Sequence, residues 1–234
     1  MPLERKKTLN VFRDAREAWG SYDDFPVGQP GTDPMPHLSR NRVAQPFYLV
    51  SEADQVLIQM AGRGEIQFRD TEGGNAGDQA RRTLRAASDE AAAPGSALEP
   101  GGTFTSRLTL VSGGQSAAQS VEPDVTRFVL EPGDTVYIPA CVPSRLIPYG
   151  ENVQVRLKAE PAVREAVAWY CDCGALVASF ELAPGIVQER YLGAVQAFNA
   201  GARRCTVCGR VHPPAELGDI DWAATAAAVR ASLS

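Results

Sequence analysis

The sequence is poor in histidine and has none of the long apolar runs that mark membrane proteins. Its 234 residues contain only two histidines, His37 and His212. No apolar run approaches the length of a membrane span, and the charged N-terminus leads into no apolar segment of a signal peptide. The formal net charge of −5 predicts no broad affinity for nucleic acid or anionic lipid. We therefore expect a cytoplasmic protein that binds neither nucleic acid nor membranes.

Cysteine is also scarce, but most of the cysteines lie close together near the C-terminus. Four of the five cysteines form two close pairs near the C-terminus, Cys171 with Cys173 and Cys205 with Cys208. Four thiolates from two tight turns can close a tetrahedral cage around one Zn²⁺ or Fe ion. Disulfides or unrelated core thiols are the alternative, but nothing else in the sequence indicates an oxidising compartment. A closed four-cysteine site is normally structural; a bound iron that carries electrons is the other possibility.

The chain divides into zones. Residues 1–45 form a polar N-terminal extension rich in Pro and Gly. Residues 46–160 are predicted to form a β-barrel with an inserted segment at 71–103. Residues 161–234 contain the cysteine module and a predicted terminal helix. Strands are expected at 47–50, 55–60, 65–68, 104–111, 127–130, 135–138 and 153–157. A helix is expected at 10–19 and another at the C-terminus, where Trp222, Ala226, Val229 and Leu233 share one face. Residues 79–93 are expected to form either a surface helix or a disordered segment.

Two stretches of the β region follow known motifs of small barrels. Gly133, Pro139 and Ser144 have the spacing of the second cupin motif. Gln55 and Gly62 have the spacing of the end of the first motif, in which a histidine precedes the Gln55 position by six residues. That place is held by Leu49 in this chain.

At these residues the chain resembles 3-hydroxyanthranilate 3,4-dioxygenase in its bacterial form. The resemblance covers residues 46–70 and 104–213, and it is best in the cysteine module, at 169–174, 182–188 and 203–213. It implies an all-β cupin (jelly-roll) barrel, a rubredoxin-like four-cysteine tail and a homodimer.

The chain departs from that family at the catalytic iron. The dioxygenases hold Fe²⁺ with two histidines and a glutamate, and the matching positions here are Leu49, Gln55 and Ser144. Leucine cannot ligate, and neutral Gln and Ser are poor Fe²⁺ ligands without a histidine or carboxylate beside them. His37 could reach a pocket only as a lone imidazole. We therefore expect one structural Zn or Fe in the four-cysteine site and no barrel metal.

A barrel without its metal can still hold a small ligand. Arg145 and Arg156 follow the second motif, and we consider both as substrate-binding residues; Arg145 is either a carboxylate clamp or a solvated arginine. Gln55 and Ser144 would bond to a ligand or to each other. Cys141 is either a packing thiol or a reactive pocket thiol. Gln55, Cys141 and Ser144 are the catalytic candidates.

Three functions follow from these observations. The first is an enzyme that acts on a small aromatic or amino-acid-derived acid by metal-independent chemistry, in a specialised biosynthetic pathway. The second is a non-catalytic descendant that binds a small molecule or supports a partner enzyme. The third is a ring-cleaving dioxygenase with unorthodox iron ligands. Ligand binding at Arg145 and turnover that depends on Cys141 or Ser144 would favour the first.

Overall fold

The computed structural model describes residues 21–26, 32–69, 125–159, 163–182, 185–216, 218 and 221–233. The predicted strand at 104–111 and the predicted helices at 10–19 and 79–93 lie outside these residues, as does the predicted insertion at 71–103. None of the helices described is long and apolar enough to cross a membrane.

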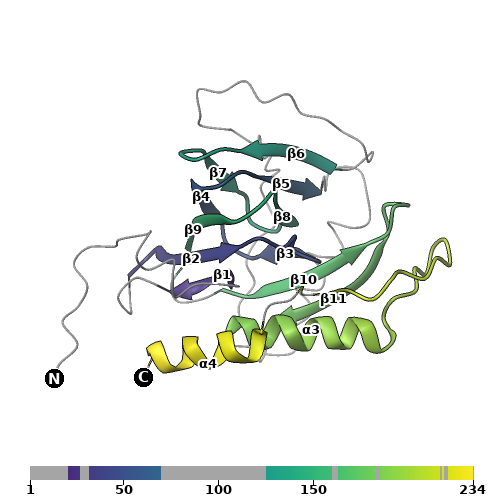
Figure 1. The fold of residues 1–234 in the computed structure, drawn as a ribbon. Coiled ribbons are helices and arrows are strands. Elements are labelled where there is room, and N and C mark those ends of the chain that lie inside the picture. Colours follow the sequence, from purple (N-terminus) through teal and green to yellow (C-terminus); the bar gives the residue numbers. More distant parts are fainter. Residues whose placement is uncertain are drawn as a thin grey trace, which may run out of the picture.

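In the part of the chain that the structure describes, eleven strands build two antiparallel sheets (Figure 1). Sheet A has the order β1-β2-β9-β4-β7, and sheet B has the order β11-β10-β3-β8-β5-β6. The strands of sheet A are β1 (Ser21–Pro26), β2 (Met35–Asn41), β4 (Gln55–Ala61), β7 (Thr135–Ile138) and β9 (Asn152–Lys158). Those of sheet B are β3 (Tyr48–Ser51), β5 (Gly64–Arg69), β6 (Val125–Leu130), β8 (Ser144–Pro148), β10 (Glu165–Tyr170) and β11 (Leu176–Leu182).

The strand order defines a jelly roll. Between β2 and β9 the chain passes from one sheet to the other at almost every connection, which gives the interlocked orders β2-β9-β4-β7 and β3-β8-β5-β6. Two four-stranded sheets with this order form the eight-stranded barrel of cupins. β1 extends sheet A at one edge, and β10 and β11 extend sheet B. The predicted cupin barrel is confirmed, and two strands of the expected N-terminal extension, β1 and β2, belong to sheet A.

An apolar cluster identifies the inner faces of the two sheets. Its buried members come from β4 and β7 of sheet A and from β5, β6 and β8 of sheet B; they are Leu57, Ile66, Phe68, Leu130, Val136, Ile138 and Leu146. Because side chains alternate along a strand, this cluster fixes which residues of each strand face the interior. On β9, Val153 and Val155 pack with Leu38 on the outer face of sheet A, so Gln154 and Arg156 point inward.

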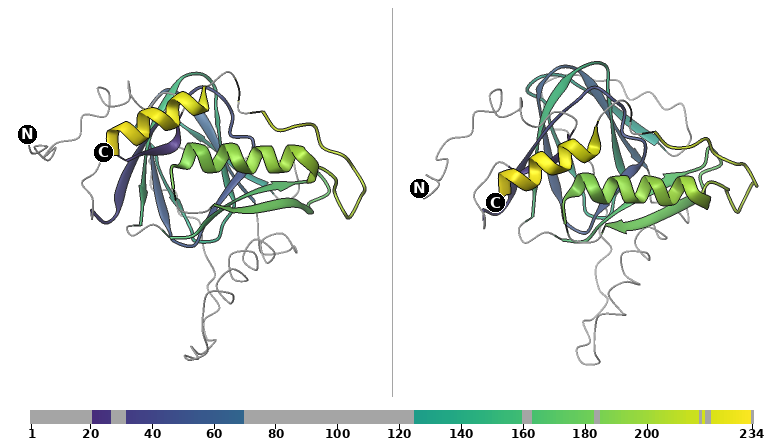
Figure 2. Two further views of the ribbon diagram at one scale, coloured as in Figure 1. Left: turned by 90° about the horizontal axis from the view of Figure 1, so that it is seen from below. Right: turned by 60° about the horizontal axis from the view of Figure 1, so that its bottom comes forward.

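Two helices close the end of the sandwich opposite β6 (Figures 1 and 2). α3 (Val187–Gly201) buries Tyr191, Ala194, Val195 and Phe198 at helical spacing. Its Phe198 ring stacks on Trp169 of β10, with ring centroids 4.4 Å apart. α4 (Trp222–Leu233) packs beside α3. It is preceded by Asp221, whose Oδ1 accepts a 2.9 Å hydrogen bond from the backbone N–H of Ala224. The predicted C-terminal helix is thus present, with Trp222 and Ala226 buried.

Candidate functional site

The inner face of sheet A carries polar residues in two neighbouring rows. Strand register places His37, Arg156 and Leu57 side by side on β2, β9 and β4. The next row along the strands holds Ser39, Gln154 and Gln59. Since Leu57 belongs to the inner apolar cluster, the polar members of these rows face the interior too. The inner face of β2 and β9 is therefore polar, whereas the interior between β4, β5, β6, β7 and β8 is apolar.

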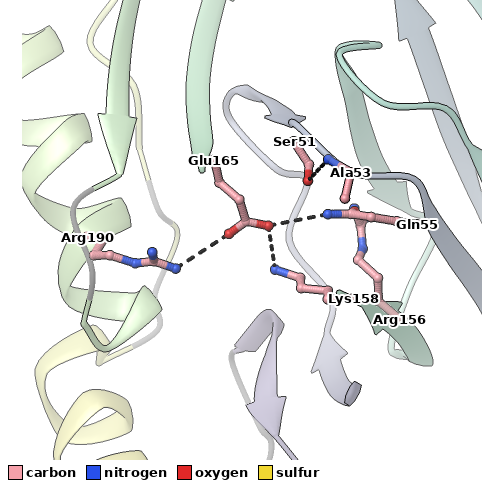
Figure 3. Close-up of polar contacts among 7 residues, drawn as sticks. All are labelled: Ser51, Ala53, Gln55, Arg156, Lys158, Glu165 and Arg190. Atoms are coloured by element: carbon pink, nitrogen blue, oxygen red, sulfur yellow. Dashed lines mark hydrogen bonds and ion pairs between the residues drawn. The ribbon is translucent and has the colours of Figure 1, made fainter. Parts of the chain in front are cut away.

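Glu165 of β10 is the centre of a buried network between the two sheets (Figure 3). Its Oε1 accepts a 3.1 Å hydrogen bond from Lys158 Nζ and a 3.3 Å bond from Gln55 Nε2. Its Oε2 lies 3.5 Å from a guanidinium nitrogen of Arg190 on α3. Gln55 Oε1 in turn accepts a 2.7 Å hydrogen bond from Arg156. One carboxylate thus holds together two sheets and a helix.

The network sets the protonation states of its members. Burial alone would raise the pKa of Glu165, but the charge and hydrogen bond of Lys158 lower it, helped by Arg190 and Arg156, and their combined effect outweighs burial. Burial and then Lys158 lower the pKa of His37 from 6.5 to about 3, against a smaller opposing effect of Glu165. His37 is therefore neutral, and Glu165 ionised, at neutral pH.

Three polar atoms beside this network are buried and have no hydrogen-bond partner: Nδ1 of His37, Oγ of Ser39 and Oε1 of Gln154. We call these three residues the inner polar patch. They occupy adjacent positions on β2 and β9, on the face that carries Arg156. A buried polar atom without a partner is costly unless water or a ligand satisfies it. The patch therefore marks a place inside the barrel where a polar ligand would gain hydrogen bonds.

The three residues predicted at iron-ligand positions, Leu49, Gln55 and Ser144, lie on the two sheets of the barrel. Leu49 of β3 and Ser144 of β8 are cross-strand partners on sheet B, and both are buried. Leu49 packs in the apolar cluster around Trp169. Gln55 lies on the facing sheet, where its amide binds Glu165 and Arg156. The three predicted iron-ligand positions therefore carry a hydrocarbon, an amide and a hydroxyl.

The other predicted site residues lie either in the barrel interior or on the outer face of sheet B. Arg156 is 1% exposed and belongs to the interior. Arg145 is the partner of Gln67 on β5 and points to the outer face, because its neighbour Ser144 points inward. Cys141 packs near Val50 and Ala166 in a separate cluster on that outer side. Arg145 and Cys141 therefore do not share the barrel interior with Gln55 and Ser144.

The four paired cysteines converge. Their sulfur atoms all lie within 4.8 Å of one another. Cys171 Sγ is 3.5 Å from Cys208 Sγ, and Cys173 Sγ is 3.7 Å from Cys205 Sγ. A tetrahedral ion with metal–sulfur bonds of about 2.3 Å separates its sulfurs by about 3.8 Å. The cluster could therefore hold one metal ion with little movement of the side chains.

Local backbone structure shapes the two cysteine turns. Gly174 and Gly209, which follow Cys173 and Cys208, have φ angles of +86° and +75°, a conformation that favours glycine. Backbone N–H groups, first that of Cys208 and also that of Val207, lower the pKa of the Cys205 thiol to about 6 and outweigh its desolvation. All four positions of the cage are filled by protein, as in structural sites. Among the described residues, no other group of three or more Cys, His, Asp or Glu side chains gathers in this way.

Sequence reasoning missed most of the inner site. Lys158, Glu165 and Arg190 form the ion-pair network, and Ser39 and Gln154 form most of the inner polar patch. The alternation of β9, in which Val153 and Val155 flank Gln154, was a usable signal for an inward-facing glutamine. No local pattern marked Glu165, because its partners come from β4, β9 and α3.

The fold and site together define a cupin-type barrel with a four-cysteine cluster. No family model matches the sequence, and no curated protein matches it. Among solved structures, hydroquinone 1,2-dioxygenase from Sphingomonas sp. TTNP3, with 4-hydroxybenzoate bound, is 18% identical with a TM-score of 0.40, over 66% of this chain and 74% of that chain.

Two further structures are similar at the same level. A second hydroquinone 1,2-dioxygenase, in complex with Cd²⁺ and 4-hydroxybenzonitrile, is 14% identical with a TM-score of 0.37, over 64% of this chain and 71% of its own. A cupin-2 domain protein from Shewanella frigidimarina is 13% identical with a TM-score of 0.36, over 65% of this chain and 95% of its own. Likeness at this level concerns the fold and assigns no activity, substrate or metal to this chain.

Proposed function

We propose that the barrel binds a small organic acid that also carries hydrogen-bond donors, and that the protein acts on this acid without a barrel iron. An aromatic or amino-acid-derived acid has this chemistry. The observation that supports the proposal is the inner polar patch of His37, Ser39 and Gln154, which lies beside Arg156 on the inner face of sheet A.

The residues around the patch can bind both the carboxylate of such a ligand and its hydrogen-bond donors. Arg156 and Lys158 are cations on the inner face, and a guanidinium matches the planar geometry of a carboxylate. His37 is neutral, because burial lowers its pKa to about 3. Its Nδ1 and Gln154 Oε1 can accept hydrogen bonds from an amine or hydroxyl group of the ligand. The Ser39 hydroxyl can donate or accept.

The side chains at the family's ligand positions support chemistry without iron. Leu49 has no donor atom, and both ends of the Gln55 amide are already bonded to Glu165 and Arg156. The remaining carboxylate of the interior, Glu165, is held by Lys158 and Arg190. A metal at this place would have to displace those cations. Of the predicted catalytic candidates, Gln55 is engaged in this network, and Ser144 is the other one on the inner side of the barrel.

A second function is supported by one feature of the same network. Glu165 already gives Lys158 and Arg190 an internal carboxylate partner, as a purely structural core would. The alternative is therefore a non-catalytic binding protein or a partner subunit, in which the network only joins the sheets.

Calorimetric titration with 3-hydroxyanthranilate, the acid implied by the family resemblance, tests the proposal. We expect saturable binding that is lost in His37→Phe and Arg156→Met and retained in His212→Phe, the matched control that removes the other histidine. Mass spectrometry of the same mixtures then tests turnover. Binding with a new product supports the enzyme, and binding without any product favours the non-catalytic alternative. Binding that is unchanged in His37→Phe and Arg156→Met would remove the inner polar patch from consideration.

A further inference from the structure

The outer face of sheet B carries a second group of polar residues that is separate from the barrel interior. Arg145 of β8 and Gln67 of β5 are partners on this face. Arg69 follows Gln67 by two positions and points to the same side. Tyr48 of β3 and Tyr170 of β10 also lie here, with ring centroids 5.3 Å apart and an interplanar angle of 85°. These five residues come from four different strands.

Arginine and tyrosine side chains stack on one another in this group. The guanidinium carbon of Arg69 lies 4.7 Å from the ring centroid of Tyr170 and 5.8 Å from that of Tyr48. The guanidinium carbon of Arg145 lies 4.8 Å from the Tyr48 centroid. Tyr48 is thus in contact with two cations. We call Tyr48, Arg69, Arg145 and Tyr170 the tyrosine–arginine cluster.

The cluster has more hydrogen-bond donors than acceptors. Arg145 Nε donates a 2.6 Å bond to Gln67 Oε1, and Arg69 Nη2 donates a long 3.5 Å bond to the backbone carbonyl of Cys171. Three further groups are buried without a partner: the hydroxyls of Tyr48 and Tyr170 and Nε of Arg69. All three can donate a hydrogen bond. Tyr48 is 4% exposed and Arg69 is 6% exposed, so bulk water does not compensate them.

The cluster also carries uncompensated positive charge. Neither Arg69 nor Arg145 forms an ion pair with the side chains that the structure describes. Two neighbouring cations, one of them buried, are costly to hold without an anion. A tyrosine hydroxyl is protonated at neutral pH, so that of Tyr170 is available as a donor. Acceptors that carry negative charge are what the cluster lacks.

We propose that the tyrosine–arginine cluster is a binding site for a small oxyanion, a carboxylate or a phosphate. The oxyanion would accept hydrogen bonds from Arg69 Nε and from the hydroxyls of Tyr48 and Tyr170, and Arg145 would add its charge. This site lies on the opposite side of sheet B from the inner polar patch, so it is additional to the acid-binding site proposed above. Aromatic walls and guanidinium groups together suit a planar carboxylate particularly well.

Calorimetric titrations with inorganic phosphate and with benzoate, at constant ionic strength in chloride, test the site. We expect binding of at least one of the two anions by the native protein. Arg69→Met should abolish it, and the Tyr48→Phe and Tyr170→Phe double variant should weaken it by about tenfold or more, the effect of losing a hydrogen bond to a charged group. Arg63→Met is the matched control, because Arg63 also lies over a tyrosine ring, that of Tyr149, but is exposed and pairs with Glu131. It should bind as the native protein does.

Thermal unfolding of the same variants separates loss of the site from loss of the fold. Without the anion, the double tyrosine variant should unfold at the native temperature or above, because it removes buried donors that have no partner. With the anion, only the native protein and Arg63→Met should be stabilised. Three results would overturn the proposal: binding of neither anion at millimolar concentration, binding that survives Arg69→Met, or binding that is lost in Arg156→Met, which would assign the anion to the barrel interior.

Discussion

Gln55 on β4 and Glu165 on β10 face each other across the barrel and are joined by a 3.3 Å hydrogen bond. The first cupin motif predicts a carboxylate at the position of Gln55. Here the interior carboxylate comes from Glu165 instead, and it binds Lys158 and Arg190 rather than a metal. An ion-pair network and a metal site exclude each other at the same carboxylate, because the neighbouring cations repel Fe²⁺.

The first prediction concerns the contribution of the Glu165 carboxylate to the free energy of unfolding. Glu165→Gln should lower the free energy of unfolding by about 3 kcal/mol or more, because it leaves the charges of Lys158 and Arg190 in the interior without their carboxylate. Urea unfolding gives the value. Glu52→Gln is the matched control: Glu52 pairs with Arg164, but both side chains are about 30% exposed, so its loss should cost less than about 1 kcal/mol. Equal effects of the two changes would contradict the central role of Glu165.

The second prediction is a pH dependence that originates at His37. In the folded state its pKa is lowered from 6.5 to about 3, so the unfolded chain takes up a proton that the folded chain does not between these values. Stability should therefore fall as the pH drops below 6.5, by up to about 1.4 kcal/mol per pH unit. Glu165, whose pKa is also lowered, adds a loss in the same direction, but only below the ordinary range of a glutamate.

The two contributions separate because they begin at different pH values. Urea unfolding between about pH 7 and 5 reports on His37, since glutamates titrate lower. His37→Phe should flatten the slope in this interval, and Glu165→Gln should leave it in place. His212→Phe should keep the native slope. If His37→Phe also kept the native slope, His37 would not be buried in its neutral form.

The sequence predicted the elements that have local signals. The cysteine spacing predicted the convergence of Cys171 and Cys208, and the motif around Gly133 predicted the strand β7. β2 was not predicted because Pro36 and polar residues interrupt its pattern, and its apolar Leu38 packs with Val155 of β9, which is distant in the sequence. α3 has a regular apolar face, with Tyr191, Ala194 and Phe198 buried, and this spacing is a local signal of a helix.

The orientation of Arg145 could also have been derived from sequence. Once Ser144 is placed inward, alternation sends Arg145 outward. The partners of Glu165 could not be derived from the sequence. Lys158 is close to Glu165 in the chain, but Gln55 lies 110 positions away. Long-range ion pairs of this kind depend on the register of strands in two sheets, which no local pattern determines.

The third prediction tests the two motif glycines separately. A Cβ at Gly62 would lie 2.3 Å from the carbonyl oxygen of Glu151, and its φ is +73°. A Cβ at Gly133 meets nothing within 4 Å, although its φ is +98°. Gly133→Ala should therefore cost about 1–2 kcal/mol of unfolding free energy from backbone strain alone. Gly62→Ala should cost clearly more, because strain and a backbone clash add. Equal costs would show that the close approach to Glu151 is unimportant.

The fourth prediction is one metal ion per chain, held by the cysteines. Elemental analysis should find one equivalent of Zn or Fe, which is lost in the Cys205→Ser and Cys208→Ser double variant and kept in Cys141→Ser. The double variant should also lose several kcal/mol of unfolding free energy, because the metal joins two loops that have little core of their own. Two equivalents, with one surviving in the double variant, would contradict the proposal of a barrel without iron.

The last prediction links the metal to the proposed oxyanion site. Tyr170 precedes Cys171 directly, and Arg69 donates to the Cys171 carbonyl, so the first cysteine turn positions two members of the tyrosine–arginine cluster. Loss of the metal should loosen this turn and weaken the binding of phosphate or benzoate, while 3-hydroxyanthranilate binding in the barrel changes less, because the inner polar patch lies on β2 and β9 of the other sheet. Titrations of the native protein before and after chelation, followed by Zn²⁺ restoration, measure both affinities. An oxyanion affinity that is unchanged by chelation would show that the cluster is held by sheet B alone.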